Sequence, residues 1–279
     1  MPKKSPILTS SFRYCAFLTV TALAVSAPAP RAAATVAPAL EASRQVEAAY
    51  RIYVHGFNVA HVLVKYRLTP IHYNISTDVD ASGLISLFLR MKIQSAAEGA
   101  FSTDWVAPHR FESGGYSRGA ERHILLTYQD GQPDIADLTP READRETVPK
   151  QALKGTLDTL SAVAMLQHRM LMTQTCNGAA NVFDGLRLTE MQVKGPIMAD
   201  VPKGNRQRYA GKMLRCDFIG RQIAGFMRET PNRALFSAPY PGAAWFDTGL
   251  AAPLIVVRFE FHHPKLGKII AVLDHYSTS

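Results

Sequence analysis

Regular alternation of apolar and polar side chains is the feature that most constrains how this chain can fold. Over residues 71–79, odd positions carry Ile, Tyr, Thr or Val, whereas even positions carry His, Asn, Ser or Asp. The same period of two recurs over residues 61–67 and 257–262. Because successive side chains of a strand point to opposite faces of a sheet, this pattern predicts half-buried antiparallel strands.

Turn residues separate these runs and add further hairpins. Gly56 and Thr69-Pro70 divide the first strands, and Asp184-Gly185 predicts a tight hairpin later in the chain. Two stretches, residues 129–155 and 231–249, are rich in polar residues, Pro or Gly and indicate long loops.

One long helix is indicated among the strands. Asp158 is a suitable N-cap for an apolar pattern that includes Leu160 and Val163 and continues to Leu171. Many strands, one main helix and no alternation of strands with crossover helices favour a mainly β fold. We therefore expect an antiparallel curved sheet, an open barrel or spiral, with the main helix packed on its concave face.

The N-terminal residues have the layout of a signal peptide. Basic residues at positions 3, 4 and 13 precede an apolar run over residues 15–27, and Ala34 closes an A-x-A cleavage site. The run is shorter than the roughly 20 residues that span a bilayer. We expect residues 1–34 to be removed on export to the periplasm, residues 35–45 to be a disordered leader, and residues 46–279 to form a single domain without a transmembrane segment.

Charge and cysteine content exclude several classes of function. The chain has 31 Lys and Arg against 23 Asp and Glu, and the four basic residues in the signal account for half of its net charge of +8. The remaining +4 gives no reason to expect a nucleic-acid partner. Cys15 leaves with the signal, so Cys176 and Cys216 form one pair, which we expect to be disulfide-bonded.

No motif in the sequence predicts a metal or a cofactor. There is no C-x-x-C, H-E-x-x-H, P-loop or dinucleotide-binding glycine pattern. His262 and His263 are adjacent, and neighbouring strand positions point to opposite faces, so the two cannot chelate one ion together.

One catalytic pattern is present at residues 115–119, Gly-Tyr-Ser-Arg-Gly, which matches the G-x-S-x-G nucleophile elbow. That elbow requires a strand, a sharp turn and then a helix. Residues 121–128 instead resemble a strand, and the candidate partners Asp274 and His275 would point to opposite faces of another strand. We favour a hairpin and assign no catalytic residue; a secreted serine hydrolase that uses Ser117 is the alternative function.

Several landmarks fall in a familiar order along the chain: Tyr53-x-x-Gly56, Asp158-Thr159-Leu160-Ser161, Val182-Phe183-Asp184-Gly185, Cys216 and the strand from Pro253 to Phe261. In this order they resemble the exported bacterial family catalogued as domain of unknown function 3108. The resemblance implies a periplasmic, mostly β protein without a defined catalytic site. By looser analogy, a curved sheet of this kind is similar to half-barrels that carry lipoproteins and hold acyl chains in an apolar concavity.

The leading hypothesis is a non-enzymatic cell-envelope protein that binds an amphiphile, such as a lipid, or another envelope component in its apolar concavity. The expected lining comes from a short apolar segment and from the helix: Leu84, Leu87, Phe88, Leu160 and Val163. Two other interpretations remain open: the same side chains simply fill a closely packed core, or the protein is a scaffold without any ligand.

Overall fold

The structure is a computed structural model that describes residues 45–83, 90–103, 105–117, 119–204, 207–229, 232–247 and 254–279. The expected signal peptide lies outside the described residues, as do the candidate lining residues Leu84, Leu87 and Phe88. Within the described ranges, no helix is long and apolar enough to cross a membrane.

Thirteen strands form one sheet in the described part of the chain. The first seven are β1 (Gln45–Val54), β2 (Phe57–Leu68), β3 (His72–Ala81), β4 (Lys92–Phe101), β5 (Val106–Ser117), β6 (Ala120–Gln129) and β7 (Gln132–Thr139). The last six are β8 (Gly178–Phe183), β9 (Leu188–Asp200), β10 (Lys212–Ala224), β11 (Tyr240–Asp247), β12 (Ile255–His263) and β13 (Gly267–Thr278).

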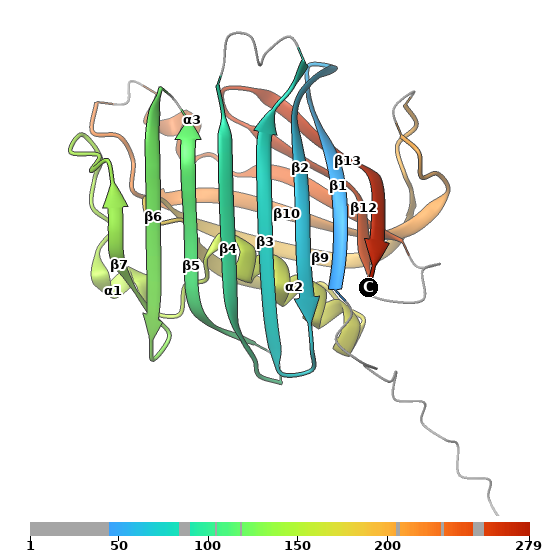
Figure 1. Cartoon of the computed structure of the whole chain (residues 1–279), viewed down its shortest axis with the longest axis horizontal. Helices are drawn as coiled ribbons and strands as arrows, with labels where there is room; N and C mark the ends of the chain where they lie inside the picture. Colours follow the sequence, from blue (N-terminus) through green and yellow to red (C-terminus); the bar gives the residue numbers. More distant parts are fainter. Residues whose placement is uncertain are drawn as a thin grey trace, which may run out of the picture. The chain divides into compact units, whose positions relative to one another are not determined.

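The strands form two antiparallel meanders that meet where β1 pairs with β13. Their order across the sheet is β7-β6-β5-β4-β3-β2-β1-β13-β12-β11-β10-β9-β8. The edge strands are therefore β7 and β8, which are neighbours in the sequence. Figure 1 shows β2 to β7 in front, with β9, β10 and β12 crossing behind them. The sheet thus curls over on itself without closing, which confirms the expected mainly β, open and curved architecture.

The segment between the two edge strands carries the helices α1 (Lys150–Leu153) and α2 (Thr159–Thr173). Helix α2 packs against β3, β4 and β5 on one side and against β8 on the other. Leu157, just before α2, forms a parallel bridge with Val182 of β8. The bridge covers part of the β8 edge and fixes the point at which the chain enters the concave side of the sheet.

Asp158 starts α2, as the sequence predicts. Its Oδ1 accepts hydrogen bonds from the backbone N–H groups of Leu160 and Ser161, at 3.0 and 2.9 Å. Its Oδ2 accepts from the Ser161 hydroxyl at 2.5 Å and from the Tyr128 hydroxyl at 3.3 Å. Burial raises the pKa of Asp158, against the effect of these donors. The N-cap therefore also attaches the helix to β6.

The face of α2 that packs on β3–β5 is not the apolar face that the sequence pattern indicates. Ser161 and His168 are buried, whereas Val163 is 43% exposed. Ser161 Oγ shares a 2.7 Å hydrogen bond with Tyr73 Oη, and the His168 ring stacks on Phe101 with a centroid separation of 4.0 Å. Ser161 is satisfied by a partner on the sheet, and Val163 is left to face the other strands.

The expected disulfide is present and joins Cys176, just after α2, to Cys216 of β10, with the two Cα atoms 6.2 Å apart. Both residues are buried in a cluster with Met170 of α2 and Phe246 of β11. The bond therefore connects the end of the helix to the second meander.

Two stretches whose composition indicates loops instead contain strands. Residues 129–155 contain β7 and α1, and residues 231–249 contain α3 (Arg233–Ser237) and β11. Asp130 and Gly131 have φ angles of 52° and 70° and form the tight turn into β7. In β11, residues 243–246 are all at most 4% exposed, so a strand buried on both faces has no alternation to reveal it.

Candidate ligand-binding site

Ser117 lies in a hairpin and not in a nucleophile elbow. It ends β5 and pairs with Ala120, the first residue of β6, while Gly119 adopts a φ of 81°. Its carbonyl oxygen accepts a hydrogen bond from Arg122 Nε at 3.3 Å. The candidate partner Asp274 lies on β13, where it pairs with Arg51 of β1. A strand therefore follows where the elbow requires a helix, and the hairpin interpretation is confirmed.

An apolar groove of about 370 Å³ lies between α2 and the second meander. Its apolar lining residues are Ala162, Val163, Met165, Leu166, Cys176, Ala179, Ala180, Val182, Met191, Val193, Phe218 and Phe259. We call this cavity the apolar groove. Val163, which the sequence analysis places at the concave face, is one of its lining residues.

The groove stays open because α2 turns its buried side toward β3–β5. Val163 is 43% exposed, and Leu166 is only partly buried. On the opposite wall, Phe218 of β10 stacks on Phe259 of β12 with ring centroids 5.1 Å apart. Phe218 also lies against Gly242 of β11, where any Cβ would collide with its ring. The aromatic wall is therefore held flat against the sheet and away from the helix.

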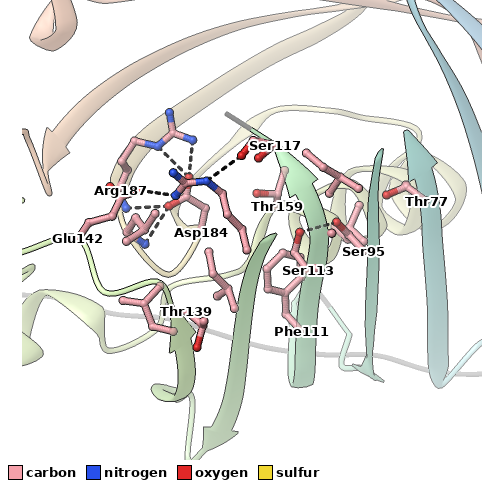
Figure 2. A pocket seen from close by; sticks show the side chains of 18 of the residues that line it. Thr77, Ser95, Phe111, Ser113, Ser117, Thr139, Glu142, Thr159, Asp184 and Arg187 are labelled. Carbon is pink, nitrogen blue, oxygen red and sulfur yellow. Dashed lines mark hydrogen bonds and ion pairs between the residues drawn. The ribbon is translucent and has the colours of Figure 1, made fainter. Parts of the chain in front are cut away.

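A second cavity, of about 320 Å³, adjoins the N-terminus of α2, and we call it the serine cavity. Figure 2 shows its polar side chains in two groups, with Ser95 and Ser113 on one side and Glu142, Asp184 and Arg187 on the other. The hydroxyls of Ser95 and Ser113 lie 2.8 Å apart. Leu160, the other helix residue expected at the concave face, lines this cavity.

Glu142 holds two arginines at the rim of the serine cavity. Its Oε1 lies 2.8 Å from Arg122 Nη1, and its Oε2 lies 2.6 Å from Arg145 Nη2. The side chains of Glu142 and Arg145 are 9% and 10% exposed. A carboxylate with two guanidinium partners is well compensated, so this network fixes the segment that follows β7.

Asp184 and Arg187, in the turn between β8 and β9, lie where the serine cavity meets the apolar groove. Both residues, together with Thr159, line both cavities. Asp184 Oδ1 accepts from the backbone N–H groups of Leu186 and Arg187 at 3.0 and 2.7 Å. Its Oδ2 pairs with Arg187 Nη2 at 2.7 Å. The turn therefore fixes Asp184, while the Arg187 side chain remains 45% exposed.

A third cavity, of about 530 Å³, meets the apolar groove at Arg187 and Gln222. Its lining residues are Arg145, Arg187, Gln222, Phe226, Met227, Phe236, His263, Lys265 and Leu266. We call it the basic mouth, because its lining carries Arg and Lys and, among the residues that the structure describes, no carboxylate. Burial lowers the pKa of His263, and the charges of Arg187 and Lys265 lower it further.

Many of the residues that line these cavities were not among the candidates that the sequence indicated. Met191 and Val193 of the groove alternate with polar residues on β9, so the period of two could have identified them. Phe218 had no comparable signal, because its place depends on the pairing of β10 with β11. In the described ranges, no group of His, Cys, Asp and Glu side chains is arranged to hold a metal ion.

Comparison with known proteins gives a family but no activity. The model of the family described as "Protein of unknown function (DUF3108)" matches residues 49–219. No curated protein matches the sequence. Among solved structures, the chain is similar to a crystal structure of a beta-barrel-like protein of domain of unknown function DUF1849 from Brucella abortus, with 11% identity and a TM-score of 0.45 over 85% of this chain and 98% of that one. The match over residues 49–219 places this chain in the DUF3108 family of proteins of unknown function.

Proposed function

We propose that this protein is a periplasmic cell-envelope protein that binds an amphiphile in the apolar groove without acting on it chemically. The observation that carries the proposal is the groove, an apolar cavity of about 370 Å³ whose lining includes the half-exposed Val163. Apolar surface that stays in water forgoes roughly 25 cal/mol per Å² of burial free energy. An acyl chain in the groove would supply that burial.

The size of the groove suits one acyl chain. Its volume of about 370 Å³ is near the lower end of the range of roughly 300–1,000 Å³ that is typical of ligand pockets. Phe218 and Phe259 form one flat wall, and the methyl groups of Val163 and Leu166 form the other. Neither wall offers the hydrogen-bond donors and acceptors that a polar ligand of this size would need.

The compartment is supported by two separate features of the chain. The basic residues, apolar run and A-x-A site at the N-terminus have the order of an export signal. The bond between Cys176 and Cys216 is of a kind that persists in oxidising compartments such as the periplasm.

The test combines recovery of a natural ligand with a variant that fills the groove. Protein purified from its own periplasm should carry an amphiphile that is visible by native mass spectrometry and by lipid extraction. The purified, delipidated protein should also raise the fluorescence of 11-(dansylamino)undecanoic acid. Val163→Trp places a large ring in the groove at a half-exposed position and should abolish most of this signal.

Met172→Trp is the matched control, because Met172 is 52% exposed on the same helix and does not line the groove. It should bind the probe as the parent does. The proposal fails if the parent protein neither carries an amphiphile nor binds the probe, or if Val163→Trp binds it as well as Met172→Trp does. Circular dichroism of both variants establishes that they are folded.

A further inference from the structure

We infer that the amphiphile carries an anionic headgroup, which lies in the basic mouth while its tail lies in the apolar groove. The inference rests on the proposed function, because the groove must hold the tail for the headgroup to be placed. Arg187 and Gln222 line both cavities, so the two cavities adjoin at these side chains, and a headgroup next to this end of the groove would lie at the mouth.

The described residues that line the mouth carry more positive charge than negative charge. Arg145 is compensated by Glu142, at 2.6 Å, with both side chains about one-tenth exposed. Arg187 shares Asp184 with the backbone of its own turn and remains 45% exposed. Lys265 Nζ lies 5.2 Å from the centroid of the Phe236 ring. Arg187 donates to Asp184 through both Nε, at 2.9 Å, and Nη2, at 2.7 Å. The ammonium group of Lys265 is therefore the charge best placed for an incoming anion, with the partly exposed guanidinium of Arg187 lining the same cavity.

The state of His263 agrees with a positive potential in the mouth. Its Nδ1 accepts hydrogen bonds from the backbone N–H groups of Lys265 and Leu266, each at 3.2 Å, which requires an unprotonated Nδ1. Burial, and then the charges of Arg187, Lys265 and His262, lower the pKa of His263. In this arrangement Nδ1 carries no proton, so the positive charge of the mouth belongs to Arg and Lys.

The serine cavity, which also adjoins the groove, is less suited to an anion. Glu142 and Asp184 both line it, whereas the described residues that line the mouth include no carboxylate. The basic mouth instead combines Arg187 and Lys265 with the apolar side chains of Phe226 and Phe236, which exclude water and strengthen a charge pair. A guanidinium binds a carboxylate or a phosphate through the same paired N–H donors, so both headgroups fit this chemistry.

The experiment compares three twelve-carbon ligands by isothermal titration calorimetry on the delipidated, mature protein. Dodecanoate and dodecyl phosphate are the anions, and glycerol monododecanoate is the neutral reference with the same tail. Both anions should bind at least about tenfold more tightly than the neutral ester, and the difference should shrink as salt is added. A tighter site for one of the anions assigns the headgroup to the carboxylate or to the phosphate class.

The variant Lys265→Gln, at a residue that lines the mouth and not the groove, should lower the affinity for the anions by about tenfold and leave that for the neutral ester unchanged. Arg221→Gln is the matched control: it removes a charge from β10, where Arg221 pairs with Glu190 at 2.7 Å and does not line the mouth. Equal affinity of the parent protein for all three ligands overturns the inference but leaves the proposed function intact. The same holds if Arg221→Gln lowers the affinity for the anions as much as the variant in the mouth does. If none of the three binds, the proposed function itself fails.

Discussion

Both meanders of the sheet face α2, but the helix packs directly on β3–β5, where the serine cavity remains near its N-terminus, and it leaves the larger apolar groove against β8–β10. On the β1–β7 side, inward residues such as Ile75, Phe111 and Leu126 are at most 5% exposed. On the β8–β13 side, Phe218 and Val193 point toward α2 but remain only partly buried. Similar strand patterns thus leave these inward side chains buried where α2 packs directly, which we call the filled half, and partly exposed along the apolar groove, which we call the open half.

The difference follows from how much concave surface one helix can cover. Helix α2 has 15 residues and is therefore about 22 Å long. Thirteen curled strands present a wider inner face than a single rod of this length can fill. Because hydrogen bonds from Ser161 and Asp158 attach the helix to β3 and β6, the uncovered area falls on β8–β10.

The largest expected effect comes from making the same substitution in both halves. Phe111→Ala removes a ring that is 5% exposed and should lower the free energy of unfolding by about 3–5 kcal/mol. Phe218→Ala removes a partly exposed ring from the groove wall and should cost about 1–2 kcal/mol, since less burial is lost. Urea denaturation measures both. Equal losses would contradict the distinction between a filled and an open half.

The disulfide offers the next largest effect, because it connects α2 to the open half. Its two cysteines are 40 residues apart, and Cys176→Ser should lower the free energy of unfolding by about 2–4 kcal/mol. Hydrogen exchange should speed up more in β8–β10 than in β3–β5. Cys216→Ser should behave in the same way, and the double variant should be no worse than either single one. Two free thiols in periplasm-purified parent protein would rule out the bond.

The smallest expected effect concerns two histidines through which the stability of the protein depends on pH in opposite directions. His123, on β6 of the filled half, contacts Asp137 at 2.5 Å and Glu112 at 2.7 Å, and these hydrogen bonds raise its pKa. Its stabilising effect is therefore complete below the pKa of an unfolded histidine and is lost as pH rises through the higher folded value. His263, beside the open half, has a lowered pKa, so folding is weakened as pH falls from the unfolded value toward the folded one.

Thermal melts between about pH 5 and 8 separate the two histidines. His123→Gln should lose stability relative to the parent on the acid side, while His263→Gln should make the protein less sensitive to acid. Both effects should be small, because water screens the exposed His123 cluster and His263 is only partly buried. If the change in melting temperature relative to the parent varied with pH in the same direction for both variants, the two environments would not differ as described.

The parts of the fold that could be predicted from the sequence are those that depend on local interactions. The period of two over residues 71–79 identified a strand, and Asp158 identified the start of α2, because both patterns act between residues close in the chain. The disulfide could be anticipated because Cys176 and Cys216 are the pair that remains if the expected signal peptide is removed. Strand β11, buried on both faces, has no such pattern, and residues 231–249 were therefore wrongly expected to form a loop.

Contacts between distant parts of the chain determine which face of α2 is buried, and therefore where the groove lies. The spacing of Leu160 and Val163 predicted the side of α2 that faces the concavity, and each of them lines a cavity, but no local pattern indicated that Ser161 would be buried. Ser161 can be buried because Tyr73, 88 residues away in the sequence, lies within hydrogen-bonding distance once the sheet has curled. A polar group is buried at low cost when a partner is present, and here the partner is supplied by the fold and not by neighbouring residues in the chain.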